Sequence, residues 1–111
     1  MNLNQFTGTE QYYKSNMFVP KMVHTEGVQY FCEQASAYWF LDIVATEVFP
    51  LLQNDPFLTI YLTVKDGKAE IIVQDGDISR LMQKQISFTD CPEGVYEFFL
   101  TDNVLMLTSE Y

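Results

Sequence analysis

The stretch FLTIYLTVKDGKAEIIVQ, residues 57–74, alternates apolar and polar side chains on both sides of an Asp-Gly pair. A period of two predicts strands with one buried face. Asp66-Gly67 predicts a two-residue type I′ turn, because both central residues of that turn need a positive φ. A turn of this length also fixes the register, in which apolar residues face one another: Ile60 and Val73, Leu62 and Ile71, Val64 and Ala69. We therefore expect a hairpin over residues 57–74.

A second hairpin is predicted near the end of the sequence. Its strands, Val95–Thr101 and Val104–Thr108, flank Asp102-Asn103. A loop of these two residues again pairs apolar side chains: Leu100 with Leu105 and Phe98 with Leu107. A further strand is expected around Met82–Thr89, ahead of a turn that contains Pro92.

Two helical segments are predicted before the strands. Thr25 is a suitable N-cap, and Glu26 suits the positive end of the helix dipole. The residues that follow have the spacing of one buried helix face: Val28, Phe31, Cys32 and Ala35. A second helical stretch, residues 36–49, is apolar nearly all round and is either separate from the first or continuous with it. Pro50 is expected to end it or to lie just beyond its end.

Residues 1–24 show no clear period. We expect an ordered arm that packs its aromatic side chains on the rest of the chain and includes a short helix around residues 8–14. The order of arm, helices and strands predicts an α+β fold, with one or two helices packed on an antiparallel sheet of about four to five strands built from the two hairpins. The length of 111 residues predicts a single domain over residues 1–111.

The charge of the chain restricts its partners. Fifteen Asp and Glu stand against six Lys and Arg, which gives a formal net charge of −9. Nucleic acids and anionic membranes are bound mainly through Lys and Arg, so we expect no direct binding to either. A protein that itself binds nucleic acid is a different partner, because its basic groove would attract an acidic surface.

The sequence also suggests a compartment. No basic stretch followed by an apolar run marks a signal peptide at the N-terminus, and the apolar run of residues 37–43 is far shorter than the ~20 residues that span a bilayer. We therefore expect a cytoplasmic protein. In that reducing compartment Cys32 and Cys91 are expected to be free thiols.

Signatures of catalysis or of metal binding are missing from the sequence. It contains no nucleophile elbow, no Walker loop and no dinucleotide-binding glycine pattern. One His and two separated Cys do not make up a usual zinc site, so neither a metal nor another cofactor is expected. A catalytic pair of His24 with Cys32 or Cys91 is an alternative, although Cys32 lies on the apolar helix face.

Two groups of residues are candidates for binding. Asp42 interrupts the apolar residues 37–45, where it either lines a pocket or meets water or the N-terminal arm. Aromatic residues of the arm and the helices either line an interface or pack in the core. With the tyrosine that ends the sequence, these groups give seven candidate binding residues: Tyr12, Tyr13, His24, Tyr38, Trp39, Asp42 and Tyr111.

Several blocks of the sequence carry a resemblance. They are QFTGTEQYY at residues 5–13, Gly27-Val28, the A-Y-W-x-x-D block at residues 37–42, F-T-D at residues 88–90 and T-S-E-Y at residues 108–111. Together they resemble a family of small, uncharacterised bacterial proteins that is known only as a domain of unknown function. The resemblance implies a bacterial, plasmid or phage setting and no catalytic residues. It also suggests that the two ends meet in the fold, with Tyr111 docked on the domain.

We weigh several functions. The favoured one is a non-catalytic protein-binding or regulatory module of a bacterium or its mobile elements. An acidic mimic of nucleic acid, which inhibits a host nuclease or defence complex in the manner of an anti-CRISPR protein, is one alternative. A small-molecule-binding protein or enzyme with a pocket near Asp42 is another. A homo-oligomer that uses its aromatic surface as its own interface is a further hypothesis.

Overall fold

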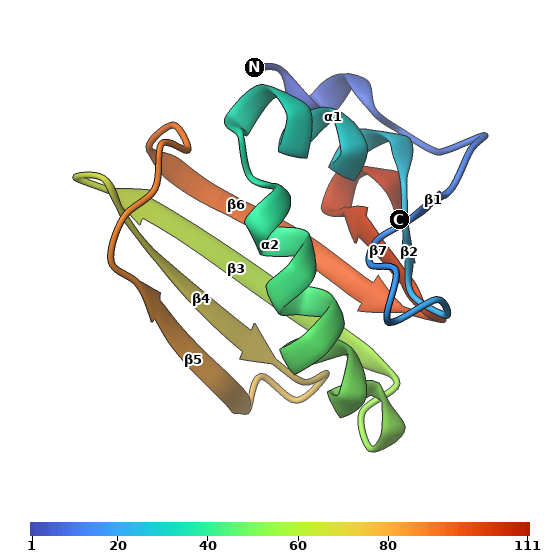
Figure 1. The fold of residues 1–111 in the computed structure, drawn as a ribbon. Helices are drawn as coiled ribbons and strands as arrows, with labels where there is room; N and C mark the ends of the chain where they lie inside the picture. Colours follow the sequence, from blue (N-terminus) through green and yellow to red (C-terminus); the bar gives the residue numbers. More distant parts are fainter.

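The computed structural model describes residues 1–111 as a layer of helices on one face of a seven-stranded sheet (Figure 1). The strands are β1 (Tyr13–Lys14), β2 (Val23–His24), β3 (Phe57–Lys65), β4 (Lys68–Gln74), β5 (Arg80–Ile86), β6 (Gly94–Thr101) and β7 (Val104–Leu107). Their order in the sheet is β1-β2-β7-β6-β3-β4-β5. All neighbours are antiparallel except β2 and β7, which are parallel.

The prediction of an antiparallel sheet of four to five strands was wrong. The fold is α+β, but the sheet is mixed, and its two additional strands come from the N-terminal arm. The arm contains the short 3-10 turn η1 (Leu3–Gln5), and no helix forms around residues 8–14. Strands of two residues are too short to show a period, so the sequence pattern missed them. Backbone bonds from Val23 and Thr25 to β7 and its turn hold β2 in place.

Both predicted hairpins are present with the predicted registers. Leu62 lies opposite Ile71 in β3–β4, and Leu100 lies opposite Leu105 in β6–β7. The turn residues adopt the positive φ values that a type I′ turn requires: Asp66 55°, Gly67 73°, Asp102 52° and Asn103 65°. β5 begins two residues earlier than expected and ends at Ile86.

The helical region is divided by a sharp break. α1 (Glu26–Ala35) is capped by Ser36, which has φ 53°, and α2 (Tyr38–Ile43) begins two residues later. The chain then passes through a π turn, η2 (Val44–Val48), and a 3-10 turn, η3 (Phe49–Gln53). The α and π turns end at Val48 and the path continues as a 3-10 turn, so Pro50 lies just beyond the α and π turns, which is one of the two predicted positions. It lies in the first turn of η3, where a missing backbone N–H is tolerated.

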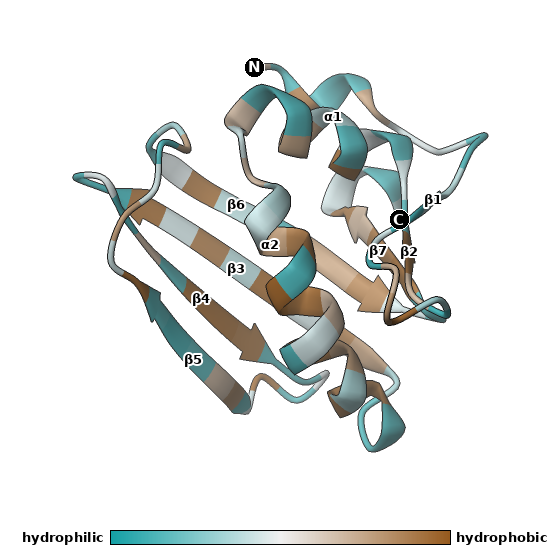
Figure 2. Cartoon of the chain, in the orientation of Figure 1, coloured by the Kyte–Doolittle hydropathy of each residue, from teal (hydrophilic) through white to brown (hydrophobic).

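The core lies between the helices and the sheet. Figure 2 shows hydrophobic residues alternating with more hydrophilic ones along β3. The predicted face of α1 is fully buried. Its Phe31 ring contacts the rings of Phe40 in α2 and Phe98 in β6, with centroids 6.4 and 5.3 Å apart. No helix in the structure has the length and the apolar character needed to cross a membrane.

Candidate functional site

The helices cover only one face of the sheet, and the opposite face is uncovered (Figure 1). We call this second face the open face. Its residues alternate with the buried ones along each strand and pair with one another across the sheet. Half-buried and exposed apolar side chains lie among its polar ones: Phe57, Tyr61, Ile72, Val95, Phe99 and Met106. Val95 in β6 is 69% exposed.

Three aromatic rings form a cluster on the open face. Phe57 of β3 lies 5.0 Å from Phe99 of β6, measured between ring centroids. Tyr111 packs against both, at 5.3 Å from Phe57 and 5.4 Å from Phe99, with its ring nearly perpendicular to each. Tyr111 is nevertheless 75% exposed. The end of the sequence is therefore fastened to the open face while most of its last ring remains available for contact.

Acidic and basic side chains occupy different parts of the open face. Glu97 lies opposite Tyr61, and burial together with this neighbouring carboxylate raises the pKa of the Tyr61 hydroxyl. Glu70 accepts hydrogen bonds from the side-chain amides of two β5 residues, Gln83 and Gln85. The middle of the face is thus acidic, and the lysines at its rim stand at the ends of the strands.

Glu110 joins the last turn, η4 (Thr108–Glu110), to the first turn of α1. Its carboxylate accepts bonds from the Thr25 hydroxyl at 2.5 Å, the Gly27 amide at 3.2 Å and the Leu107 amide at 3.0 Å. Thr25 caps α1 as predicted, with its hydroxyl accepting from the Val28 amide at 3.3 Å. A carboxylate at this position also suits the positive end of the helix dipole.

The N-terminal arm reaches the same helix end. The Glu26 amide donates to the Thr9 hydroxyl at 3.1 Å, and the Glu10 amide donates to the Glu26 carboxylate at 3.3 Å. Both ends of the chain therefore converge on the start of α1, as the resemblance suggested. A shallow cavity of about 480 Å³ lies between residues 5–10 of the arm and Glu26.

His24 is buried at the joint between the arm and α1. Its Nδ1 lies 2.8 Å from the Ser15 hydroxyl, its Nε2 lies 2.6 Å from Gln29 Oε1, and its ring stacks on Tyr13. The amide oxygen of Gln29 is an acceptor, so Nε2 carries the proton and Nδ1 accepts from Ser15. Burial lowers the pKa of His24, and the bond to Gln29 only partly offsets this effect.

The cysteines do not join this histidine. Both ring nitrogens of His24 bond to Ser15 and Gln29, and both cysteines are buried free thiols. Burial raises the pKa of Cys32 to about 12 and also raises the pKa of Cys91. Since the thiolate is the nucleophile, these thiols lack the activated state that a Cys–His pair requires.

The seven candidate binding residues do not form one site. Tyr13, His24 and Tyr38 belong to one network, because Gln29 Nε2 donates to the Tyr38 hydroxyl at 3.1 Å. The remaining candidates are spread over the molecule: Tyr12 is exposed on the arm, Trp39 is half-buried with its ring nearly perpendicular to that of Phe40, and Tyr111 lies on the open face.

Asp42 is exposed and fastens the arm. Its carboxylate accepts a bond from the Asn16 side-chain amide at 3.0 Å, which holds the turn between β1 and β2 against α2. None of the three cavities of the structure is lined by Asp42. The second of the two readings that the sequence allowed, a contact with the arm, is the observed one.

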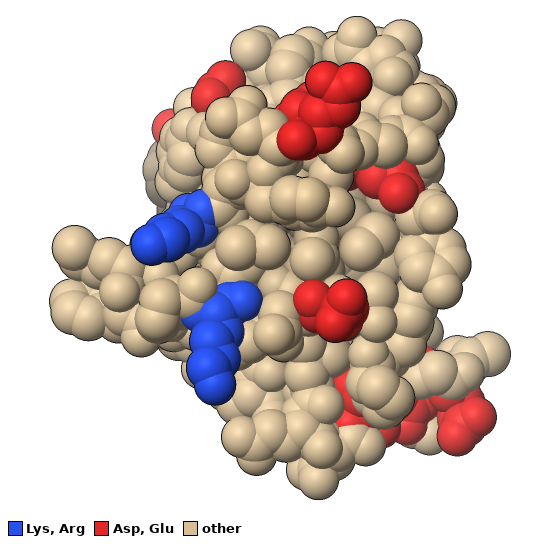
Figure 3. Space-filling view, turned by 90° about the vertical axis from the view of Figure 1, so that its right-hand side faces the viewer, with Lys and Arg blue, Asp and Glu red and all other residues tan.

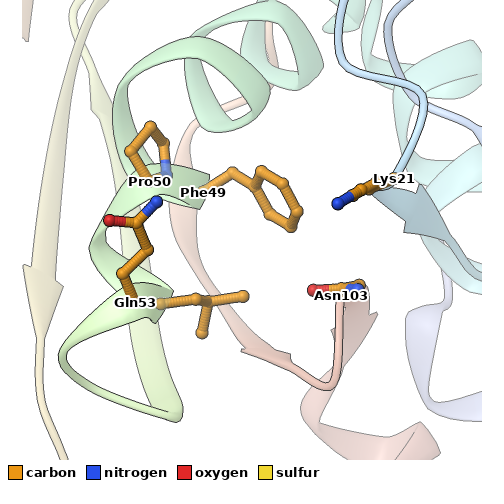
Figure 4. Close-up of a pocket in the computed structure, with 6 residues that line it drawn as sticks. Lys21, Phe49, Pro50, Gln53 and Asn103 are labelled. Atoms are coloured by element: carbon orange, nitrogen blue, oxygen red, sulfur yellow. The ribbon is translucent and has the colours of Figure 1, made fainter.

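Sequence reasoning missed a cavity of about 420 Å³ beside η3 (Figure 4). Its lining comes from three separate segments: Lys21 before β2, Phe49, Pro50, Leu52 and Gln53 of η3, and Asn103 in the β6–β7 turn. No spacing along the chain marks residues that meet only through the fold.

The acidic side chains are distributed over the surface without much pairing. Figure 3 shows several of them set apart from one another, and two basic side chains next to each other. The single salt bridge joins Lys84 of β5 to Glu47 of the π turn, at 3.0 Å. Most of the negative charge is therefore free to act on a partner.

Comparison with curated proteins and with solved structures found no match to the chain. A family model described as a family of unknown function, DUF6876, matches residues 1–111. This match confirms that the chain resembles a family of unknown function. The bacterial setting stays a prediction. With its whole length matched, the chain belongs to DUF6876, a family of unknown function.

Proposed function

We propose that the chain is a non-catalytic protein-binding module and that the open face is its docking surface. The observation that carries the proposal is the cluster of Phe57, Phe99 and Tyr111 on a sheet face that no helix covers. Aromatic residues with a polar tip are enriched in binding hot spots, because they combine a large apolar area with a hydrogen-bonding group.

Other residues of the open face extend the docking surface beyond the cluster. Val95 and Tyr111 are exposed, so a partner gains apolar contact without a rearrangement of the fold. Thr59 lies opposite Phe99, Thr63 opposite Val95 and Glu97 opposite Tyr61, so polar groups alternate with apolar ones across this surface. A mixture of apolar and polar area is usual in a non-obligate protein interface.

The charge of the chain favours a basic partner over a second copy. Two copies would bring a net charge of −9 against another −9, and the acidic middle of the open face would meet itself. We therefore propose a partner protein whose contact surface has an apolar patch opposite the aromatic cluster and Lys or Arg opposite Glu97 and Glu70. Electrostatic attraction then raises the rate of association, and the aromatic cluster determines how long the complex lasts.

The test compares two surface variants in affinity capture from the cells that produce the chain. Val95→Gln with Tyr111→Gln removes apolar area from the open face, and both positions are exposed enough to leave the fold intact. Phe18→Gln is the matched control, because Phe18 is 84% exposed on the turn between β1 and β2, outside the open face. Thermal unfolding verifies that all variants are folded.

We expect a partner that the wild type and Phe18→Gln both retain and that the double variant loses. Raised salt should slow its capture without abolishing it, because the apolar cluster is not screened. Equal retention by the double variant, or a loss seen only with Phe18→Gln, contradicts the open face as the docking surface. Complete loss of capture at raised salt favours the acidic mimic of nucleic acid in its place.

A further inference from the structure

The cavity beside η3 has an unpaired cation at its edge. Figure 4 shows the side chain of Lys21 and the ring of Phe49 pointing toward one another across the opening, with Asn103 beside them. The single salt bridge of the chain is that between Lys84 and Glu47, so the ammonium of Lys21 has no carboxylate partner. None of the fifteen Asp and Glu residues lines the cavity.

The lining is unusual for so acidic a chain. A net charge of −9 makes a carboxylate the expected neighbour of an exposed lysine, yet Lys21 faces apolar walls and amides. Lys21 is the only charged residue that lines the cavity. The electrostatics of the cavity therefore select a negatively charged group.

The walls of the cavity favour a ligand with a flat apolar group. Phe49, Pro50 and Leu52 supply them, and a volume of about 420 Å³ lies within the range of small-molecule sites. Phe49 follows directly on the π turn Val44–Val48. A π turn is a rare conformation that is frequent at functional sites. Here it precedes the residue whose ring faces Lys21.

The third wall is held by the backbone of a hairpin. Asn103 occupies a type I′ turn with φ 65°, and its carbonyl oxygen accepts the Val23 amide at 3.0 Å. The two segments that carry Asn103 and Lys21 are thereby joined through the pairing of β2 and β7. The amide of Asn103 provides an additional hydrogen-bond donor next to the ammonium.

We propose that this cavity binds a small organic anion with one carboxylate and a flat apolar group. The carboxylate pairs with the ammonium of Lys21 and accepts from the amide of Asn103, and the flat group lies against Phe49 and Leu52. This site is separate from the open face, so the proposal does not depend on the proposed function.

The test is a titration with phenylacetate and hexanoate as anionic probes, in which binding is monitored through the amide chemical shifts of the protein. Phenylethanol, which keeps the ring and lacks the charge, is the neutral counterpart of phenylacetate. We expect saturable shifts at residues 21, 49–53 and 103 with phenylacetate, and binding about tenfold weaker with phenylethanol. The Val95→Gln, Tyr111→Gln variant should bind phenylacetate like the wild type, which separates this site from the open face.

Two lysine variants then locate the charge. Lys21→Gln should weaken phenylacetate binding about tenfold, because it removes a charge-assisted hydrogen bond. Lys14→Gln is the matched control, since Lys14 is an exposed lysine of β1 that does not line the cavity. The absence of saturable phenylacetate binding overturns the proposal, and so does binding of hexanoate alone. An equal loss in the two variants also overturns it, because that result would indicate attraction by charge alone.

Discussion

At Gly27 the first turn of α1 meets the end of the chain, and the contact leaves no room for a side chain. A Cβ at this position would lie 2.6 Å from both Glu110 Oε1 and Leu107 Cδ1. The carboxylate of Glu110 is held there by three hydrogen bonds, so it cannot move aside without losing them. The absence of a side chain at Gly27 thus permits the close contact between α1 and η4.

Gly27→Ala is therefore expected to destabilise the chain. Overpacking of a tight contact costs about 1–3 kcal/mol in the free energy of unfolding. Urea denaturation measures the change, and Gly8→Ala is the control, because a Cβ at Gly8 meets nothing within 4 Å. Equal stability of the two variants would show that the contact with Glu110 is looser than the structure has it.

His24 makes the stability of the fold depend on pH. Burial lowers its pKa below the ordinary value of 6.5, so the unfolded chain binds a proton more readily than the folded chain. The contribution of neutral His24 is fully present above pH 6.5 and is lost as the pH falls toward the lowered pKa of the folded state.

The measurement is the free energy of unfolding between about pH 5 and pH 8. Wild-type stability should decrease as the pH falls through this range. In His24→Gln the decrease should be absent, because His24 is the only histidine of the chain. A decrease of the same size in the variant would assign the pH dependence to other groups.

At the scale of elements, the two hairpins show which structures a local pattern determines. The turn of β3–β4 requires a positive φ at Gly67, which has φ 73°. Gly67→Ala should cost about 1 kcal/mol, because a Cβ is strained in this conformation whatever space surrounds it. Gly76→Ala, at another open loop position, should be close to neutral in the same thermal unfolding experiment. An unchanged midpoint for Gly67→Ala would contradict the type I′ turn.

Elements that depend on distant partners were predicted less well. The registers of both hairpins and the buried face of α1 follow from residues close in sequence, and they were predicted correctly. β2 joins the rest of the sheet through β7, which lies about 80 residues further along the chain. The cavity beside η3 likewise combines Lys21, Phe49 and Asn103, so no local pattern contained it.

At the scale of the whole molecule, an apolar open face and a strong negative charge act against each other. The face offers contact to any apolar surface, including that of a second copy. The net charge of −9 at pH 7 keeps copies apart through repulsion, which is why a basic partner is favoured over self-association. The balance between these two effects depends on pH, since protonation of the carboxylates removes the repulsion while the aromatic cluster stays.

Self-association should therefore appear as the pH approaches the isoelectric point of about 4.2. Light scattering should report a monomer mass at pH 7 and a rising mass as the pH falls toward this value. The Val95→Gln, Tyr111→Gln variant should remain monomeric to lower pH than the wild type, because it has lost apolar area and kept every charge. The fold of each sample is followed by circular dichroism, so that association is separated from the loss of stability at His24. A dimer mass at pH 7 would mean that the open face already meets a second copy. Association that the double variant does not reduce would mean that the chain associates through another surface.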